Sequence, residues 1–390
     1  MAYLGTKPAD AVLETDDITD GVITTSKLAD DSVTNPKLST GSQQNFRNII
    51  INGDMSIAQR GTSSSGNTTD VIQLDRMTVG ISSSGTYTVS QDTDVPTGQG
   101  FAKSLKIDNT SATSGGTISV YQKIEGQNLQ YLKKGTANAE SITVSFWVKS
   151  NKTGTGVCEL YDNDNTRQIS ATYTINSADT WEKKTITFAG DTTGALDNDN
   201  NLSMYCFIWF DALAILQSGT LNTSWNSVTA ANRVVGANID LGDSTSNYAN
   251  VTGFQMEAGT SASDFEFLPV DVNLGRCQRY YDVHADGSES ATSKLAVASA
   301  YTINTAYTVI NFTQKMRAAP SLDFVSGVGY YRIRSAGVNH PNTADMTISS
   351  ATTINCRFVI NTADTLTAGY SGWITINNQA TGFIAFDAEL

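Results

Sequence analysis

Ser141-Ile-Thr-Val-Ser-Phe-Trp-Val-Lys149 alternates two kinds of side chain along its length. The even positions from Ile142 to Val148 are all apolar, whereas the odd positions hold Ser, Thr, Lys and one aromatic residue, Trp147. A period of two is typical of a β-strand that turns one face toward a core and the other toward solvent. The stretch therefore predicts a half-buried strand.

Similar runs recur on both sides of this stretch. Residues 182–188 and 252–258 repeat the alternation, and residues 202–210 are almost continuously apolar. A continuous apolar run predicts a strand that is covered on both faces, at the centre of a sandwich. Clusters of Gly, Asn, Asp and Ser separate the runs and favour turns, at 63–67, 109–116, 163–165 and 197–201. Many short strands between turns predict an all-β fold, either a β-sandwich or a jelly roll.

The composition argues against several classes of protein. The 390 residues include 25 Lys and Arg against 38 Asp and Glu, a formal net charge of −13, whereas following a nucleic-acid backbone requires a basic surface. The first residues lack the basic and apolar regions of a secretory signal. The longest apolar stretch, 204–216, is shorter than the roughly 20 residues that cross a bilayer. We therefore expect no nucleic-acid partner, no signal peptide and no membrane insertion.

Residues 1–44 contain little that could form a core. They hold seven acidic and three basic residues and a single aromatic residue, Tyr3. Ile23-Thr-Thr-Ser-Lys-Leu28 is echoed ten residues later by Val33-Thr-Asn-Pro-Lys-Leu38. So short a repeat buries too little apolar area to offset the entropy of ordering it. The segment is either a flexible linker or an extended segment that becomes ordered by winding around copies of itself.

A helix is predicted at 271–281, directly after Pro269. Asp271 can cap its N-terminus, and four residues recur at the spacing of one helix face: Leu274, Cys277, Gln278 and Tyr281. We interpret this helix as a joint between two folded parts.

The chain is predicted to contain three regions. Beyond the helix, strand-like runs resume at 309–312, 356–360, 372–376 and 383–386. Residues 45–270 carry 14 basic and 22 acidic residues, whereas residues 271–390 carry eight and nine. We therefore expect an extended N-terminal segment over 1–44, a sandwich or jelly roll over 45–270, and a smaller C-terminal β domain over 271–390.

Six short segments follow one another along the chain: Asn48-Ile-Ile-Ile-Asn-Gly-Asp-Met-Ser-Ile-Ala-Gln-Arg-Gly61, Leu74-Asp-Arg76, Gln122-Lys-Ile-Glu-Gly126, Ser145-Phe-Trp-Val-Lys-Ser150, Gln255-Met-Glu-Ala-Gly259 and Arg276-Cys-Gln-Arg-Tyr-Tyr281. They are preceded by MAYLGTKPAD at the start of the chain and by ITDGVITTSKLADDSVT from Ile18. In this order the segments resemble the tail fibre proteins of tailed bacteriophages, whose jelly roll is similar to carbohydrate-binding modules. The order is more specific than any one segment.

The resemblance implies a virion structural protein of the tail fibre, assembled in the host cytoplasm as a homotrimer. Residues 1–44, with Tyr3 and Leu4, would attach the fibre to tail proteins of the particle. The distal partner would be a host cell-surface glycan or an outer-membrane receptor. The family commonly has an aromatic residue after the Asp-Arg pair, where this chain has Met77, which puts a stacking role at this position in doubt.

Sequence motifs for catalysis are sparse. The chain contains no GxSxG, HExxH or GxxxxGK[ST] motif, and its two histidines, His284 and His340, are expected in surface loops. Glycan cleavage would need two carboxylates across a groove, about 5–10 Å apart, and nothing in the sequence indicates the large β-helix of depolymerase spikes. We therefore expect no enzyme activity, no catalytic residues and no cofactor.

Acidic clusters and cysteines offer weak metal signals. Asp162-Asn-Asp164 and Asp197-Asn-Asp199 place oxygen donors at alternate positions, as a Ca²⁺ loop does. Neither continues as an EF-hand, so turn formation is the better explanation and no metal site is predicted, although Ca²⁺ stays an alternative. The four cysteines are far apart and form no CxxC pair, which predicts buried free thiols: Cys158, Cys206, Cys277 and Cys356.

Two sets of residues are candidates for binding. Trp147, Trp181 and Trp225 could stack on a saccharide; alternatively, each covers an edge of the core with its indole nitrogen hydrogen-bonded. Tyr and Arg, which are enriched in binding hot spots, occur together in a second set of receptor-binding candidates: Tyr330, Arg332, Arg334 and His340.

If 330–334 is a strand, Tyr330 and the two arginines share its outer face, whereas Tyr331 and Ile333 point inward. Alternatively, the arginines pair with a neighbouring subunit of a trimer.

Together these observations favour a tail fibre that attaches the virion to the host cell surface. Several copies of the fibre on one particle raise the effective concentration of its binding sites at the cell surface. Weak contacts of single sites can therefore add up to firm, multivalent adhesion. The alternatives are a virion-associated glycan depolymerase and a purely structural virion protein without receptor contact.

Overall fold

The computed structural model describes residues 23–24, 27–28, 46–82, 85–286, 294–363, 366–377 and 382–390. The predicted attachment residues Tyr3 and Leu4, and most of the decapeptide repeat, lie outside the described residues. Residues 1–45 and 46–390 form two separate units. Every helix and strand named below belongs to the second unit.

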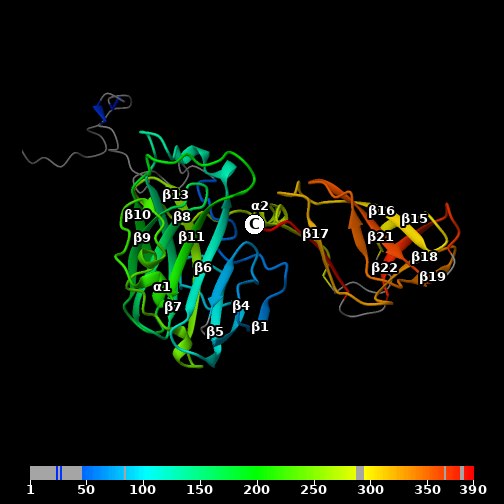
Figure 1. Cartoon of the computed structure of the whole chain (residues 1–390), viewed down its shortest axis with the longest axis horizontal. Coiled ribbons are helices and arrows are strands. Elements are labelled where there is room, and N and C mark those ends of the chain that lie inside the picture. Colours follow the sequence, from blue (N-terminus) through cyan, green and yellow to red (C-terminus); the bar gives the residue numbers. More distant parts are fainter. Residues whose placement is uncertain are drawn as a thin grey trace, which may run out of the picture. The chain divides into compact units, whose positions relative to one another are not determined.

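Two antiparallel sheets form a β-sandwich within residues 63–258 (Figure 1). The six-stranded sheet has the order β1 (Ser63–Asn67), β4 (Gly85–Asp92), β5 (Ser104–Ala112), β13 (Tyr248–Ala258), β7 (Ile142–Ser150) and β10 (Glu182–Phe188). The seven-stranded sandwich sheet has the order β12 (Asn226–Ser227), β9 (Arg167–Ile175), β8 (Gly154–Asp162), β11 (Leu202–Asp211), β6 (Thr117–Glu125), β3 (Thr78–Ser82) and β2 (Val71–Ile72).

Alternating side chains place the core of the sandwich between these sheets. In β7, Val144, Phe146 and Val148 are completely buried and Trp147 is half-buried. The predicted solvent face is not confirmed for the first part of the strand, since Thr143 and Ser145 are also buried. The apolar run 202–210 forms β11, which lies between β8 and β6 near the middle of its sheet, as predicted. Its inward residues join the same core as those of β7. Local alternation was therefore sufficient to predict which side chains meet in the core.

One predicted turn is wrong, and the turn predicted at 109–116 begins only after residue 112, where β5 ends. Residues 63–67 form β1, which pairs antiparallel with β4 at the edge of the six-stranded sheet. Its sequence, SSSGN, carries no apolar side chain. An edge strand is held by backbone hydrogen bonds on one side only, so its side chains need not show the alternation that identifies a central strand.

The predicted helix is present with different ends. It spans Val270–Gln278 (α2), and Pro269, not Asp271, occupies the N-cap position. Asp271 lies in the first turn, where its charge favours the positive end of the helix dipole. Tyr281 belongs to the following strand, while Cys277 and the neighbouring Tyr280 enter an apolar cluster with Ile51 and Ile57. Among the described residues, no helix is long and apolar enough to cross a membrane.

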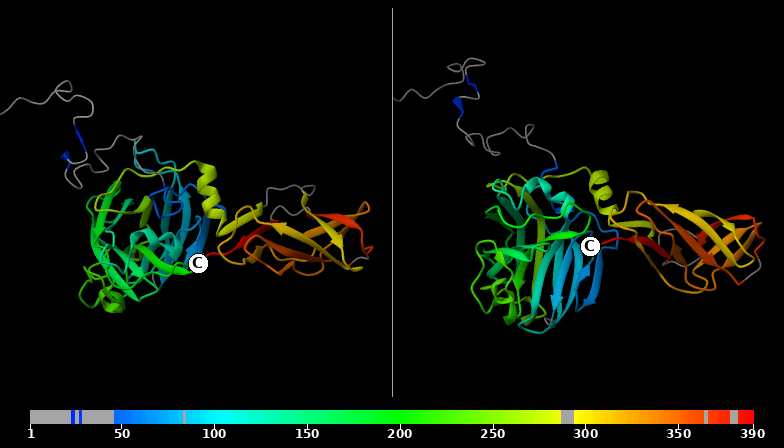
Figure 2. Two further views of the ribbon diagram at one scale, coloured as in Figure 1. Left: turned by 90° about the horizontal axis from the view of Figure 1, so that it is seen from above. Right: turned by 45° about the horizontal axis from the view of Figure 1, so that its top comes forward.

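The C-terminal domain contains two further antiparallel sheets, drawn in yellow to red in Figure 2. The three-stranded sheet has the order β14 (Tyr281–Asp286), β23 (Phe383–Asp387) and β17 (Ser321–Phe324). The seven-stranded C-terminal sheet has the order β19 (Val338–Pro341), β18 (Tyr331–Ser335), β22 (Ser371–Ile376), β15 (Lys294–Ala300), β16 (Thr305–Asn311), β21 (Asn355–Asn361) and β20 (Thr347–Ser349). The structure thus confirms an all-β fold with a sandwich followed by a smaller β domain.

Short helical segments complete the described elements. They are α1 (Ala214–Gln217) and the 3₁₀ turns η5 (Gly126–Asn128), η6 (Gln130–Leu132), η7 (Ala230–Asn232) and η8 (Leu241–Asp243). Both α1 and η7 lie in the segment 212–240 that follows β11. This segment also contains the two-residue strand β12 and is called loop 212–240 below.

Several segments that carried the sequence resemblance meet where α2 adjoins the sandwich. Gln122 exchanges two hydrogen bonds with the backbone of Ile51, at 2.8 Å each. The Arg279 guanidinium donates to both carboxylate oxygens of Glu125, at 2.9 and 2.7 Å. The Arg76 guanidinium lies 3.5 Å from the centre of the Tyr280 ring. These residues therefore serve the architecture of the junction.

Candidate functional site

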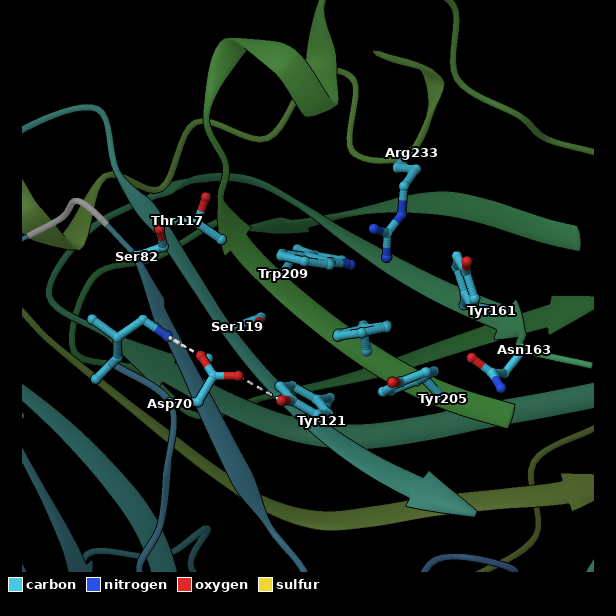
Figure 3. Close-up of a pocket in the computed structure, with 13 residues that line it drawn as sticks. Asp70, Ser82, Thr117, Ser119, Tyr121, Tyr161, Asn163, Tyr205, Trp209 and Arg233 are labelled. Carbon is cyan, nitrogen blue, oxygen red and sulfur yellow. Dashed lines mark hydrogen bonds between the residues drawn. The ribbon is translucent and has the colours of Figure 1, made fainter. Parts of the chain in front are cut away.

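A groove of about 330 Å³ lies on the outer face of the seven-stranded sandwich sheet (Figure 3). Strands β3, β6, β8 and β11 supply its floor and sides, and the loops before β2 and after η7 supply its rim. It is lined by Asp70, Gly80, Ile81, Ser82, Thr117, Ser119, Tyr121, Tyr161, Asn163, Tyr205, Phe207, Trp209 and Arg233.

The alternation of β11 directs its aromatic residues into the groove. The inward face holds Met204, Cys206, Ile208 and Phe210, which are completely buried in the sandwich core. Because successive side chains point to opposite faces, Tyr205, Phe207 and Trp209 must line the outer face. The pairing places Tyr161 beside Tyr205 and Tyr121 beside Phe207, so the aromatic surface extends across three strands.

The three rings of β11 form a stacked row. The ring centres of Tyr205 and Phe207 are 5.2 Å apart with an angle of 16° between the planes. Phe207 and Trp209 follow at 4.7 Å and 21°. Tyr161 meets Tyr205 edge-on at 5.7 Å and 87°. Near-parallel rings at this spacing stack face to face along the strand, so the row contributes mainly ring edges to the apolar floor of the groove.

Arg233 borders one side of the groove and is held by a buried carboxylate. Its guanidinium donates to both oxygens of Glu159 at 2.8 and 3.0 Å, and Trp209 Nε1 donates to Glu159 Oε2 at 2.9 Å. The Glu159 side chain is completely buried; burial raises its pKa, which the Arg233 charge opposes. The guanidinium carbon also lies 4.9 Å from the centre of the Tyr161 ring. This network fixes Arg233 above the aromatic row.

Asp70 and Tyr121 form the opposite rim (Figure 3). The Tyr121 hydroxyl donates to Asp70 Oδ2 at 2.7 Å, and the Ile81 amide donates to Oδ1 at 3.1 Å. Burial, followed by this contact with the Asp70 carboxylate, raises the pKa of Tyr121 far above neutrality, so the phenol stays protonated. A Cβ at Gly80 would lie 2.6 Å from Ser119 Oγ, so a larger residue there would displace the Ser119 side chain.

The groove is covered at one end and open at the other. The loop 212–240 packs Val234 and Ala237 against the outer face, and Trp209 is only 5% exposed. Tyr161 and Tyr205 are half-buried and remain accessible. The covering of both faces of β11 was predicted, but the second cover is a loop that leaves part of the aromatic row uncovered. Accessible aromatic rings with hydroxyl, amide and carboxylate groups around them can bind a polyhydroxylated molecule.

The predicted tryptophans lie outside this groove. Trp225 packs against the core, its Nε1 donates to the Ala189 carbonyl at 2.8 Å, and the Lys134 ammonium lies 5.2 Å from its ring. Trp181 Nε1 donates to Asp94 Oδ1 at 2.9 Å. Trp147 lies on the six-stranded sheet and is half-buried. The structure does not bring the three side chains together with the stacked row, and their stacking role stays a prediction.

The C-terminal candidates separate into exposed and buried residues. Tyr331 and Ile333 point inward and are completely buried, as predicted, and Arg334 is exposed. Arg332 donates to Thr375 Oγ1 at 3.1 Å and to Asn377 Oδ1 at 2.8 Å. Tyr330 precedes β18 and packs against the C-terminal core instead of joining the outer face.

The positions predicted for both histidines are wrong. His340 lies in β19 and is 7% exposed, because a tight turn at Ala336-Gly337, with φ of 49° and 82°, folds β19 back onto β18. In that register His340 lies opposite the inward-facing Ile333. His284 lies in β14, where its Nε2 is 3.1 Å from Asp282 Oδ2. Polar neighbours in the sequence had indicated loops, but cross-strand pairing decides both positions.

The two acidic clusters serve as turns. Asp162 faces the Lys134 ammonium at 2.5 Å and accepts from the Asn165 amide at 3.0 Å. Asp199 Oδ1 accepts from the Asn201 amide at 2.9 Å. Within the described ranges, no group of three or more His, Cys, Asp or Glu side chains is placed to hold a metal ion. All four cysteines are free and buried, as predicted.

Sequence reasoning missed the groove although one signal was present. Tyr205, Phe207 and Trp209 recur at a period of two, but they stand within a run that is apolar on both faces. Asp70 and Arg233 come from loops far away in the sequence. Only pairing between strands shows that these residues share one surface.

Comparisons with known proteins give fold likenesses only. The sequence matches no family model and no curated protein. Among solved structures, the chain is similar to the enzymatically active domain of tailspike protein 4 of bacteriophage CBA120, with 13% identity, a TM-score of 0.29 and coverage of 54% of this chain and 21% of that one. The chain thus spans about a fifth of the length of that tailspike domain.

Two further likenesses are to sugar-binding proteins. A putative sugar-binding protein from Bacteroides thetaiotaomicron has 13% identity and a TM-score of 0.31, with coverage of 54% of this chain and 99% of that one. The family 11 carbohydrate-binding module of Clostridium thermocellum, in complex with a β-1,3-1,4-mixed-linked tetrasaccharide, has 10% identity and a TM-score of 0.24, with coverage of 52% and 98%. The functional proposal for this chain rests on the geometry of its own groove.

Proposed function

We propose that this chain is a non-catalytic adhesion protein whose sandwich binds a saccharide in the groove. The observation that carries the proposal is the open end of the groove, where the half-buried rings of Tyr161 and Tyr205 lie on an outer sheet face with polar groups on both sides. One face of a pyranose ring presents C–H groups, which pack against an aromatic ring, while its hydroxyls point sideways. The groove offers both kinds of contact.

The charges at the rim support a neutral ligand. Arg233 is paired with Glu159, so this pair contributes no net charge. Asp70 remains as an acceptor for sugar hydroxyls at the other rim, and Ser82, Ser119 and Asn163 add uncharged polar groups. An anionic sugar would face Asp70 without a free cation opposite it.

We further propose that the protein acts as the tail fibre of a phage and attaches the virion to its host by multivalent adhesion. The support is the ordered set of sequence segments and an N-terminal region too poor in apolar residues to fold alone. In this proposal residues 1–44 join the fibre to the tail, and three copies of the chain wind together there.

Replacing Tyr205 with Ala is expected to weaken saccharide binding about fivefold, because an aromatic contact contributes ~1 kcal/mol beyond its buried area. The measurement is binding of the full chain to an array of bacterial surface saccharides, followed by titration with the best ligand. Tyr131 in η6 is 47% exposed and lies outside the groove, so Tyr131→Ala is the matched control.

Equal loss in both variants, or no loss in Tyr205→Ala, would contradict the groove assignment. Release of new reducing ends from a bound polysaccharide would instead favour a depolymerase.

The mass of the full chain in solution tests the assembly. We expect three times the 41.7 kDa of one chain, because the N-terminal repeat needs partner chains to bury its apolar residues. Light scattering after gel filtration measures this mass, and deletion of residues 1–44 should lower it. A monomeric full chain would refute the trimeric fibre and leave the groove assignment untouched.

A further inference from the structure

The C-terminal domain separates its charges between its two sheets. The three-stranded sheet carries four aspartates and no Lys or Arg: Asp282, Asp286, Asp323 and Asp387. The seven strands of the C-terminal sheet carry four cations and no Asp or Glu: Lys294, Arg332, Arg334 and Arg357. In a chain of net charge −13, an acid-free sheet with four cations is a distinct basic surface.

The outer face of this sheet also presents exposed apolar side chains in register with the cations. Arg334 pairs with Trp373 on β22, and Trp373 pairs with Val297 on β15. Trp373 is 45% exposed and Val297 62% exposed. The same residues line a hollow of about 390 Å³, together with Ala336, Gly337, Ser371 and Gly372. The Lys294 ammonium lies 5.1 Å from the centre of the Trp373 ring.

The pattern continues across the next two strands. The Arg357 guanidinium lies 4.9 Å from the centre of the Tyr307 ring, and Tyr307 stacks on Tyr301 with the ring centres 4.8 Å apart. Val309, opposite Arg357 in the register, is 62% exposed. Aromatic rings and cationic groups thus lie side by side over this face.

Three of its cations form no ion pair with the described residues of the domain. Among the described residues, Lys294, Arg334 and Arg357 take part in none of the ion pairs. Aspartates of the three-stranded sheet are engaged there: Tyr281 donates to Asp323 at 2.6 Å, and the Thr313 amide donates to Asp282 at 2.7 Å. The positive charge of the face is therefore available to an external anion.

We propose that this basic aromatic face, defined by Lys294, Val297, Tyr307, Arg334, Arg357 and Trp373, binds an anionic polysaccharide. A pyranose packs on the exposed indole of Trp373, and carboxylates along the polymer meet the guanidinium groups of Arg334 and Arg357. Guanidinium forks match carboxylates in a bidentate geometry. A neutral sugar would leave the cations unused, and an apolar partner would have to desolvate them.

Charge also opposes the pairing of this face with itself in a second copy of the chain, because like charges would meet in a two-fold contact. The basic aromatic face could instead contact an acidic surface on another copy of the chain. The experiment below distinguishes such a contact between copies from polysaccharide binding.

The probe is polygalacturonate, which carries one carboxylate on each sugar, with dextran as the neutral comparison. We expect the full chain to bind polygalacturonate and not dextran at this face, with an affinity that falls as salt concentration rises. The variant Arg334→Ala/Arg357→Ala should lose at least tenfold in affinity and show a weaker salt dependence. Trp373→Ala should lose about fivefold with the salt dependence unchanged, because it removes stacking and no charge.

Two control variants test whether a loss of polygalacturonate binding comes from the basic aromatic face. Lys315 is an exposed cation outside the seven strands, so Lys315→Ala should change the affinity less than twofold. Tyr205→Ala should leave polygalacturonate binding intact, so failure of the groove proposal is distinguishable from failure of this one. Circular dichroism and gel filtration verify that each variant is folded.

Three results would overturn the proposal. They are absence of binding to polygalacturonate at low salt, equal loss in Lys315→Ala, and a drop in oligomeric mass in the double arginine variant without loss of binding. The last result would identify the face as a contact between subunits.

Discussion

Replacing Lys134 with Met is expected to lower the free energy of unfolding of the sandwich by about 3–5 kcal/mol. The Lys134 side chain is 3% exposed, and its ammonium lies 2.5 Å from Asp162 Oδ2 and 3.0 Å from Asp191 Oδ2. It also donates to the carbonyl of Gly194 at 2.8 Å. Methionine has a similar length and no charge, so the change leaves a buried carboxylate, Asp162, without its cation.

The neighbouring residue supplies a matched control. Lys133 pairs with Glu140 at 2.6 Å, but the two side chains are 52% and 39% exposed. Lys133→Met should therefore cost less than about 0.5 kcal/mol, as exposed ion pairs do. Urea unfolding followed by tryptophan fluorescence measures both values.

A second change shows that the loss comes from the unpaired charge. Lys134→Met/Asp162→Asn should recover more than half of the stability lost in Lys134→Met, because no buried carboxylate then remains without a cation at that position. If Lys133→Met and Lys134→Met lowered the free energy of unfolding equally, burial of the ion pair would not explain the loss of stability.

Replacing Arg76 with Met is expected to lower the free energy of unfolding by about 3 kcal/mol. The Arg76 side chain is 2% exposed and forms an ion pair with Glu389, near the end of the chain. It also donates to the Lys123 carbonyl at 2.5 Å and lies over the Tyr280 ring. Removal of the guanidinium leaves an acceptor and a largely buried carboxylate to be satisfied by other groups.

Arg334→Met is the matched control, since Arg334 is exposed and forms no ion pair with the described residues. It should change stability by less than about 0.5 kcal/mol. In the Arg76→Met variant, limited proteolysis should cut the last residues of the chain sooner than in the parent. An unchanged urea midpoint and an unchanged cleavage pattern would show that this contact does not anchor the C-terminal residues.

Sequence segments and the groove lie on different parts of the sandwich. Residues such as Gln122, Glu125 and Arg279 form hydrogen bonds at the junction with α2, whereas the groove is built from Tyr205, Phe207 and their neighbours. The residues that carry the sequence resemblance therefore hold the fold together at this junction and do not line the groove. The ligand must be inferred from the residues that line the groove.

Alternation alone determined the strands that form the core. The predicted runs 182–188 and 252–258 correspond to β10 and to the C-terminal part of β13, and run 202–210 became the central strand β11. Side-chain direction along an extended chain is a local property with a period of two residues, so it can be read without knowledge of the partner strands. The same reasoning failed for edge strand β1 and for His340, where pairing with another strand decides the position.

Tertiary structure alone decided which outer surfaces are accessible. Both faces of β11 are apolar: one holds Tyr205, Phe207 and Trp209, and the other holds the row buried in the core. The sequence therefore does not distinguish a covered face from an open one. Loop 212–240 covers the Trp209 end and delivers Arg233 to Glu159, 74 residues earlier in the chain. Exposure depends on where such distant segments fold, because burial is a property of all neighbours in space and not of the strand itself.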